Sequence, residues 1–247
     1  MSISTEIARL QQAKSDLATS IAAKGVTVPA ATTIDGYAAL VDQIQTGGGG
    51  GTLPYDAEVL YIQGDGSAYI DTGIVDKGQY KIVAHVGYTV PTVNNEYVFI
   101  YGYSNSWSTK ARAIRIQKGT KVLYVWYNNS ESNLSLSGTN VTIGDSPTSV
   151  KADGTTLSTR SSANINNTYS IFLFARNATG SPNFGNNTTS IASLRFYSFR
   201  IYNGNMLLLD LIPVRVGTVG YMYDKVSGEL FGNANSTGAF TLGPDVT

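Results

Sequence analysis

The residues best suited to hold a ligand are aromatic rings beside amide side chains in the middle of the chain. Sugar rings stack their C–H faces on aromatic planes, and amides donate to and accept from hydroxyl groups. The segment from Tyr101 to Trp107 has this character, and we interpret it as a loop. Trp107 in the core is the alternative, whereas Trp126 lies in an alternating strand pattern and is expected in the core. The residues predicted to bind carbohydrate are Asn94, Asn95, Tyr103, Asn105, Trp107 and Asn128.

A run of positive charge follows, because no acidic residue occurs between Glu96 and Glu131. We interpret it as the solvated face of a hairpin, where lysines also discourage pairing of strand edges. A patch for acidic polysaccharide is the alternative interpretation. The five residues are Lys110, Arg112, Arg115, Lys118 and Lys121.

Composition excludes several other chemistries. The chain has 247 residues, 17 Lys and Arg against 17 Asp and Glu, one histidine and no cysteine. Balanced charge argues against nucleic acid as the main partner, and the absence of cysteine excludes thiolate sites. The lone His85 excludes a multi-histidine metal centre, and we expect it to be an ordinary strand residue. Asp145 and Asp153 could help to bind calcium, but isolated acids in turns favour turn formation, so no metal or cofactor is predicted.

The five glycines at 47–51 divide the chain into two parts, because they contribute no side chains to a core. We predict a helical segment at 1–46, a linker at 47–51 and a β domain at 52–247. The β domain shows short, evenly spaced strand patterns, which favour an antiparallel sandwich or barrel. The predicted strands are 57–63, 68–72, 79–86, 111–117, 121–127, 170–175, 191–202 and 206–213, with a hairpin turn at 118–120.

The first helix carries a coiled-coil-like seam of three heptads that predicts oligomerisation. Isoleucine at heptad position a with leucine at position d favours a two-stranded coiled coil. A second helix is predicted from Thr32, with Asp35 as a capping partner. Its expected stripe is Ile34, Tyr37, Val41 and Ile44, and the seam of the first helix is Ile3, Ile7, Leu10, Lys14, Leu17 and Ile21. Either the helices close on each other as a hairpin, or they form a self-associating stalk or a plug for another protein.

Several short sequences stand out at the two ends of the β domain and in the helical part. In the β domain they are EVLYIQ (58–63), GSAYIDTG (66–73), FRIYNG (199–204), DLIPVR (210–215) and GYMYDKVSGE (220–229), and in the helical part AKGVTVP (23–29) and IDGYAAL (34–40). With these residues, both ends of the β domain resemble concanavalin A-like (laminin G-like) jelly-roll domains of bacteriophage and prophage fibre proteins. The helical part resembles a segment recurrent in phage virion proteins. The stretch from Thr89 to Asn187 carries no such resemblance.

The resemblance implies a virion fibre of the head or tail, commonly a homotrimer. Its helices would oligomerise or contact other virion proteins, and its jelly roll would attach to a bacterial surface glycan. We expect such a protein to be made in the host cytoplasm and to reside in the virion, without a membrane partner. A purely structural, capsid-decorating fibre is the alternative.

A glycan hydrolase is the third hypothesis. Glycoside hydrolysis needs two carboxylates held ~5 Å or ~6.5–9.5 Å apart. Jelly-roll glycanases with a retaining mechanism carry them as Glu-x-Asp-x-x-Glu, which is absent here. The glutamates of the β domain have no acidic neighbour within two positions, except Glu58 near Asp56. We therefore expect no catalytic residues.

Overall fold

The chain forms two compact units, 1–53 and 54–247. The computed structural model describes residues 2–22, 26–43, 53–88, 97–105, 111–117, 122–128, 130–136, 138–185 and 194–246. The predicted glycine linker at 47–51 lies outside the described residues.

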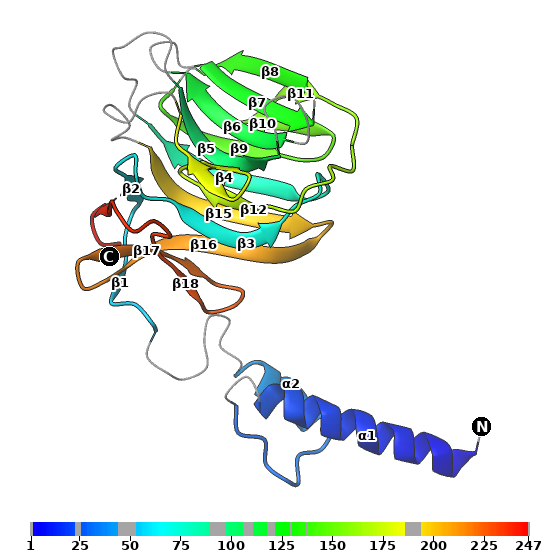
Figure 1. Cartoon of the computed structure of the whole chain (residues 1–247). Helices are drawn as coiled ribbons and strands as arrows, with labels where there is room; N and C mark the ends of the chain where they lie inside the picture. The colour runs from blue at the N-terminus through cyan, green and yellow to red at the C-terminus, as the bar shows by residue number, and fades with distance from the viewer. Residues whose placement is uncertain are drawn as a thin grey trace. The chain divides into compact units, whose positions relative to one another are not determined.

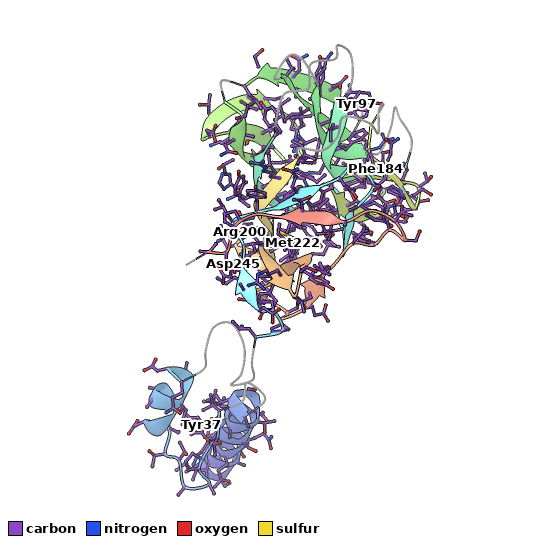
Figure 2. All side chains as sticks on the ribbon, turned by 90° about the vertical axis from the view of Figure 1, so that its left-hand side faces the viewer. Tyr37, Tyr97, Phe184, Arg200, Met222 and Asp245 are labelled. Carbon is purple, nitrogen blue, oxygen red and sulfur yellow. The ribbon has the colours of Figure 1, made fainter. Side chains whose placement is uncertain are left out.

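The first unit is built from two helices, α1 (Ile3–Ala22) and α2 (Gly36–Val41). Its small core joins Ile21 to Val26, Tyr37 and Leu40. Tyr37 lies between the helices (Figure 2), and its hydroxyl donates a hydrogen bond of 3.4 Å to the Lys14 carbonyl. The C-terminal part of α1 therefore closes on α2 as a hairpin.

The predicted stripe of the second helix is wrong in part. Ile34 and Val41 are 66% and 48% exposed, whereas Tyr37 and Leu40 are buried. Ile44 lies outside the described residues. The helix has only six residues, so one turn touches α1 and a longer stripe has nothing to pack against.

The seam of α1 is largely uncovered. The exposed fractions are 81% for Ile3, 51% for Ile7, 50% for Leu10 and 42% for Leu17. Only the last seam residue, Ile21, is buried, at 2% exposure. Four large apolar side chains on one helix face thus remain unburied within this chain.

The second unit consists of two sheets, shown in Figure 1. Within the described residues, the first sheet has eleven strands: β1 (Ala57–Glu58), β2 (Ile62–Gly64), β4 (Lys81–Gly87), β9 (Asn140–Asp145), β10 (Ser149–Ala152), β11 (Thr155–Thr159), β15 (Arg195–Asn203), β16 (Met206–Val216), β17 (Val219–Asp224), β18 (Leu230–Phe231) and β19 (Phe240–Leu242). The second has eight: β3 (Ile70–Val75), β5 (Tyr97–Ser104), β6 (Ala111–Gln117), β7 (Val122–Asn128), β8 (Ser130–Ser135), β12 (Ser170–Leu173), β13 (Arg176–Ala178) and β14 (Ser181–Asn183).

Strand pairing is antiparallel apart from a short parallel contact between β13 and β5. The first sheet begins with β11-β10-β9-β4-β15, and the second ends with β5-β6-β7-β8, so β11 and β8 are edge strands. The predicted hairpin is confirmed, because β6 and β7 pair from Ala111↔Asn128 to Gln117↔Val122. The prediction of a mainly β fold with antiparallel sheets is confirmed.

The core lies between the sheets and is rich in aromatic side chains. Tyr101 of β5 meets Phe199 of β15 edge-to-face, with ring centroids 5.4 Å apart. Phe174 meets Phe196 in the same way at 4.7 Å. Such pairs add to the free energy gained from burying the rings. Among the described helices, none has the length and apolar character needed to cross a membrane.

Strand β5 replaces part of the predicted loop. Its residues 98–104 are buried, so the strand is covered on both faces. Gly102 has φ +143°, and a Cβ there would collide with the backbone of Arg112 and Ala113 on β6. The glycine that suggested a loop therefore permits close approach of two central strands.

Candidate functional site

Of the six residues predicted to bind carbohydrate, the structure describes Tyr103, Asn105 and Asn128. Asn94, Asn95 and Trp107 lie outside the described residues. Tyr103 is fully buried on β5, so its ring belongs to the core and has no face for a sugar. Asn105 is half-buried, and its amide donates a hydrogen bond of 3.1 Å to the Asn166 carbonyl. Asn128 is exposed at the end of β7 and has φ +55°.

Arg112 is the centre of a buried ion network between the two sheets. Its side chain is 1% exposed and extends from β6 to carboxylates that are fully buried. Nη1 lies 2.6 Å from Oδ2 of Asp76, and Nε lies 2.9 Å from Oδ2 of Asp145. Nη2 also donates to the Asp145 carbonyl at 2.8 Å. The prediction that Arg112 lies on a solvated face is wrong, because two buried carboxylates draw it into the core.

The remaining atoms of both carboxylates are also bonded. Oδ1 of Asp76 accepts the backbone N–H groups of residues 78, 79 and 80 at 2.9–3.1 Å. The Tyr101 hydroxyl donates to Asp145 at 3.1 Å, and the Tyr103 hydroxyl donates to Asp76 at 3.4 Å. Asp145 also pairs with Arg160. Two carboxylates and two guanidinium groups therefore balance in charge.

The network holds Asp145 and Arg112 in their charged forms. Burial by itself would raise the pKa of Asp145, but the charges of Arg112 and Arg160 outweigh it and lower that pKa below its ordinary value. Burial would lower the pKa of Arg112, whereas the two aspartates raise it well above its ordinary value. Burial raises the pKa of Tyr101 far above 10, so its hydroxyl stays a donor. Asp145, a possible calcium ligand in the sequence, is thus committed to two arginines.

Arg160 connects this network to the surface. Its guanidinium carbon lies 3.8 Å from the centre of the Tyr127 ring, and its Nε donates to the Ser146 carbonyl at 3.1 Å. The Tyr127 hydroxyl donates to the Gly78 carbonyl at 2.7 Å and accepts the Ala163 N–H at 3.1 Å. Arg160 and Tyr127 also line a cleft at the surface. The wall of that cleft is consequently fixed by hydrogen bonds and ring stacking.

This edge cleft, as we call it, is a hollow of about 420 Å³ between the edge strands β8 and β11. The two strands lie near each other in the upper part of the sandwich in Figure 1. Ligand sites in proteins commonly have ~300–1,000 Å³. Its lining comprises Val125, Tyr127 and Ala163, the polar residues Asn128, Glu131 and Arg160, and six hydroxyl-bearing residues: Ser130, Ser132, Ser158, Thr159, Ser161 and Ser162.

The alternation of β8 explains why the cleft is polar. Trp126 pairs with Glu131 on the outer face of the sheet, so Ser130 and Ser132 point to the inner side. Inner positions of a sandwich normally carry apolar side chains. Serines at these positions leave a polar gap at the edge of the sandwich, where apolar side chains would otherwise pack against each other. The sequence signal for the cleft is the recurrence of serine at 130–135 and 158–162. Of the three described residues that were predicted to bind carbohydrate, Asn128 lines the cleft.

The outer face of the second sheet carries a different cluster, centred on Arg115. Its guanidinium carbon lies 4.3 Å from the Tyr97 ring centre, 4.8 Å from Tyr124 and 4.7 Å from Trp126. Nη2 also pairs with Glu131 at 2.7 Å. The expectation that Trp126 belongs to the core is wrong. Both sets of alternating residues in β7 are apolar or aromatic, and the smaller set at 123 and 125 faces inward with residue 127.

Arg176 extends the same outer face. It is 2% exposed, and its guanidinium lies 4.8 Å from the Phe99 ring centre. Burial lowers its pKa to about 10. Arg112, Arg115 and Arg176 are therefore engaged by carboxylates or rings, and Lys110, Lys118 and Lys121 lie outside the described residues.

Other candidate residues have structural surroundings. His85 stacks on Tyr197 at 4.7 Å, with the rings tilted by 27°. Asp153 accepts the Thr142 N–H at 2.8 Å, in the turn after β10. Within the described part of the chain, no cluster of three or more potential metal ligands occurs.

No family model matches the chain, and no curated protein matches it. The structure therefore defines a class only: a two-sheet, mainly antiparallel β protein with a hydroxyl-lined cleft at one edge, and a separate helical hairpin.

Proposed function

We propose that this protein is a bacteriophage or prophage virion fibre protein whose β-sandwich, of concanavalin A-like jelly-roll type, attaches to bacterial surface carbohydrate without catalysis. The observation that carries the attachment role is the edge cleft. Its hydroxyl and amide groups offer both donors and acceptors, which matches the hydroxyl groups of a sugar. Its wall is held by Arg160 and Tyr127, so a ligand would meet a preformed surface.

A non-catalytic role fits the charges of the cleft. Glu131 is the one carboxylate among the described residues that line it, and it is paired with Arg115 at 2.7 Å. Hydrolysis of a glycosidic bond requires two carboxyl groups that flank the bond. The cleft therefore suits binding better than bond cleavage.

The helical unit supports the fibre part of the proposal. The exposed seam residues of α1 would be buried if copies of the chain associated through this helix. A homotrimer, as the fibre resemblance implies, would present three clefts together. Several weak sites on one particle bind a repeating surface far more tightly than one site does.

The test measures binding of the fluorescently labelled full chain to intact bacteria with and without capsular polysaccharide. We expect capsule-dependent binding that is lost after periodate oxidation of the cells and kept after protease treatment. Ser132→Trp, which fills the cleft, should abolish binding, whereas Asn133→Trp on the opposite face of β8 should not. Binding to no strain supports a purely structural, capsid-decorating fibre, and release of reducing ends from the capsule supports a hydrolase.

A further inference from the structure

A second hollow lies further along β8 and β11 than the edge cleft. It measures about 200 Å³, and Ser135, Leu136, Asn140, Asp153, Thr155 and Leu157 contribute to its lining. The edge cleft lies at the start of β8 and the end of β11, and this hollow lies at the opposite ends of the same strands. Six residues of extended chain cover on the order of 20 Å, so the two hollows lie along one line between β8 and β11, which we call the strand seam.

We propose that the ligand is a neutral, extended oligosaccharide that lies along this seam and occupies both hollows. The inference rests on the proposed function and names the substrate class of the same site. A single sugar ring would fill one hollow only. A chain of several rings would meet hydroxyl groups along both strands, from Ser132 and Ser158 at one end to Thr155 at the other.

The charges along the seam favour a neutral chain. The charge of Arg160 is matched by Asp145, and that of Glu131 by Arg115. The charged residue among those that line the second hollow is Asp153, an exposed acidic residue. A uronic acid polymer would therefore meet no uncompensated cation among the described lining residues, and it would be repelled at one end.

The short side chains favour a glycan over a peptide. A peptide that adds to a sheet edge gains specificity from pockets that accept its alternate side chains. The seam instead offers many serine and threonine side chains, beside the leucines Leu136 and Leu157 of the second hollow.

The experiment titrates the full chain with neutral gluco-, galacto- and manno-oligosaccharides from disaccharide to hexasaccharide, beside oligogalacturonates of equal length. We expect affinity for one neutral series to rise with length until the seam is filled. Ser132→Trp should weaken binding of every length at least tenfold. Thr155→Trp should reduce the affinity of the longest chain to that of a short one and leave the short chains unchanged. Asn133→Trp is the matched control, because it adds the same ring on the opposite face.

Three results would contradict the proposal that an extended neutral oligosaccharide binds along the seam. They are preference for the uronate series, affinity independent of length, or an unchanged affinity of Thr155→Trp for the longest chain. If glycans still bind to Ser132→Trp but not to Trp126→Ala, attachment stands and the site lies on the outer face of the second sheet. If neither oligosaccharides nor capsulated cells bind, the proposed function itself fails.

Discussion

Replacing Arg112 by methionine should be among the most damaging single changes in the β unit. Methionine keeps much of the length of the side chain but removes its charge and its three hydrogen bonds to Asp76 and Asp145. Asp145 would still have Arg160, whereas Asp76 would keep only the Tyr103 hydroxyl and backbone N–H groups. A carboxylate buried without its cation is expensive, and breaking such a pair costs about 3–5 kcal/mol.

That cost is a large part of the ~5–15 kcal/mol by which domains are stable. Urea unfolding of the full chain, followed by tryptophan fluorescence, isolates the effect, because Trp107 and Trp126 both lie in the β unit. For a loss of this size the unfolding midpoint should fall by roughly 1–2 M.

The matched control is Arg200→Met. Like Arg112, Arg200 pairs with an aspartate. Its partner is Asp210 at 2.7 Å, and the Arg200 side chain is 42% exposed. An exposed pair contributes about 1 kcal/mol or less. Adding Asp76→Asn to Arg112→Met should recover part of the lost stability, because it removes the orphaned charge. Equal destabilisation by the two arginine variants would refute the reasoning.

Three further predictions concern acid, association and strand contact. Because the pKa of Asp145 is lowered in the folded protein, its stabilisation is complete above the unfolded pKa of about 4 and is lost as the pH falls below it, which urea midpoints at successive pH values will show. Leu10→Asp should make the full chain monomeric in sedimentation velocity, whereas Ala8→Asp, outside the seam, should leave the oligomer intact. Gly102→Ala should lower stability by at least about 1–3 kcal/mol, while Gly144→Ala, whose added Cβ would meet only a side chain at 3.9 Å, should cost far less in the same assay.

Strands whose apolar residues alternate cleanly could be predicted from the sequence. Strand β6 has the predicted bounds, and β4, β7, β15 and β16 overlap their predictions. Strand β5 could not, because glycine, serine and tyrosine in Tyr101 to Ser104 are equally typical of a loop. The sequence also did not decide which alternating side chains of β7 face the core, because both sets are apolar or aromatic. Trp126 was therefore assigned to the wrong face of the sheet.

The ion network was beyond sequence reasoning for a different reason. Arg112 lies 36 residues from Asp76 and 33 from Asp145. Nothing local selects these partners from the other acids, because their meeting depends on how two sheets are stacked. The cleft depends on the same stacking, although the serines of β8 and β11 were visible as an unusual run.

The network and the edge cleft have a common physical basis. A sandwich edge lined with serine gains little from the hydrophobic effect, since each buried leucine or valine would contribute about 1.5–3 kcal/mol and a serine hydroxyl does not. Something else must fix the distance between β8 and β11. Arg160 does so from one side, because it is bonded to Asp145 in the first sheet and stacked on Tyr127 in the second. The buried charges therefore tie the two sheets together beside the edge cleft and fix its wall.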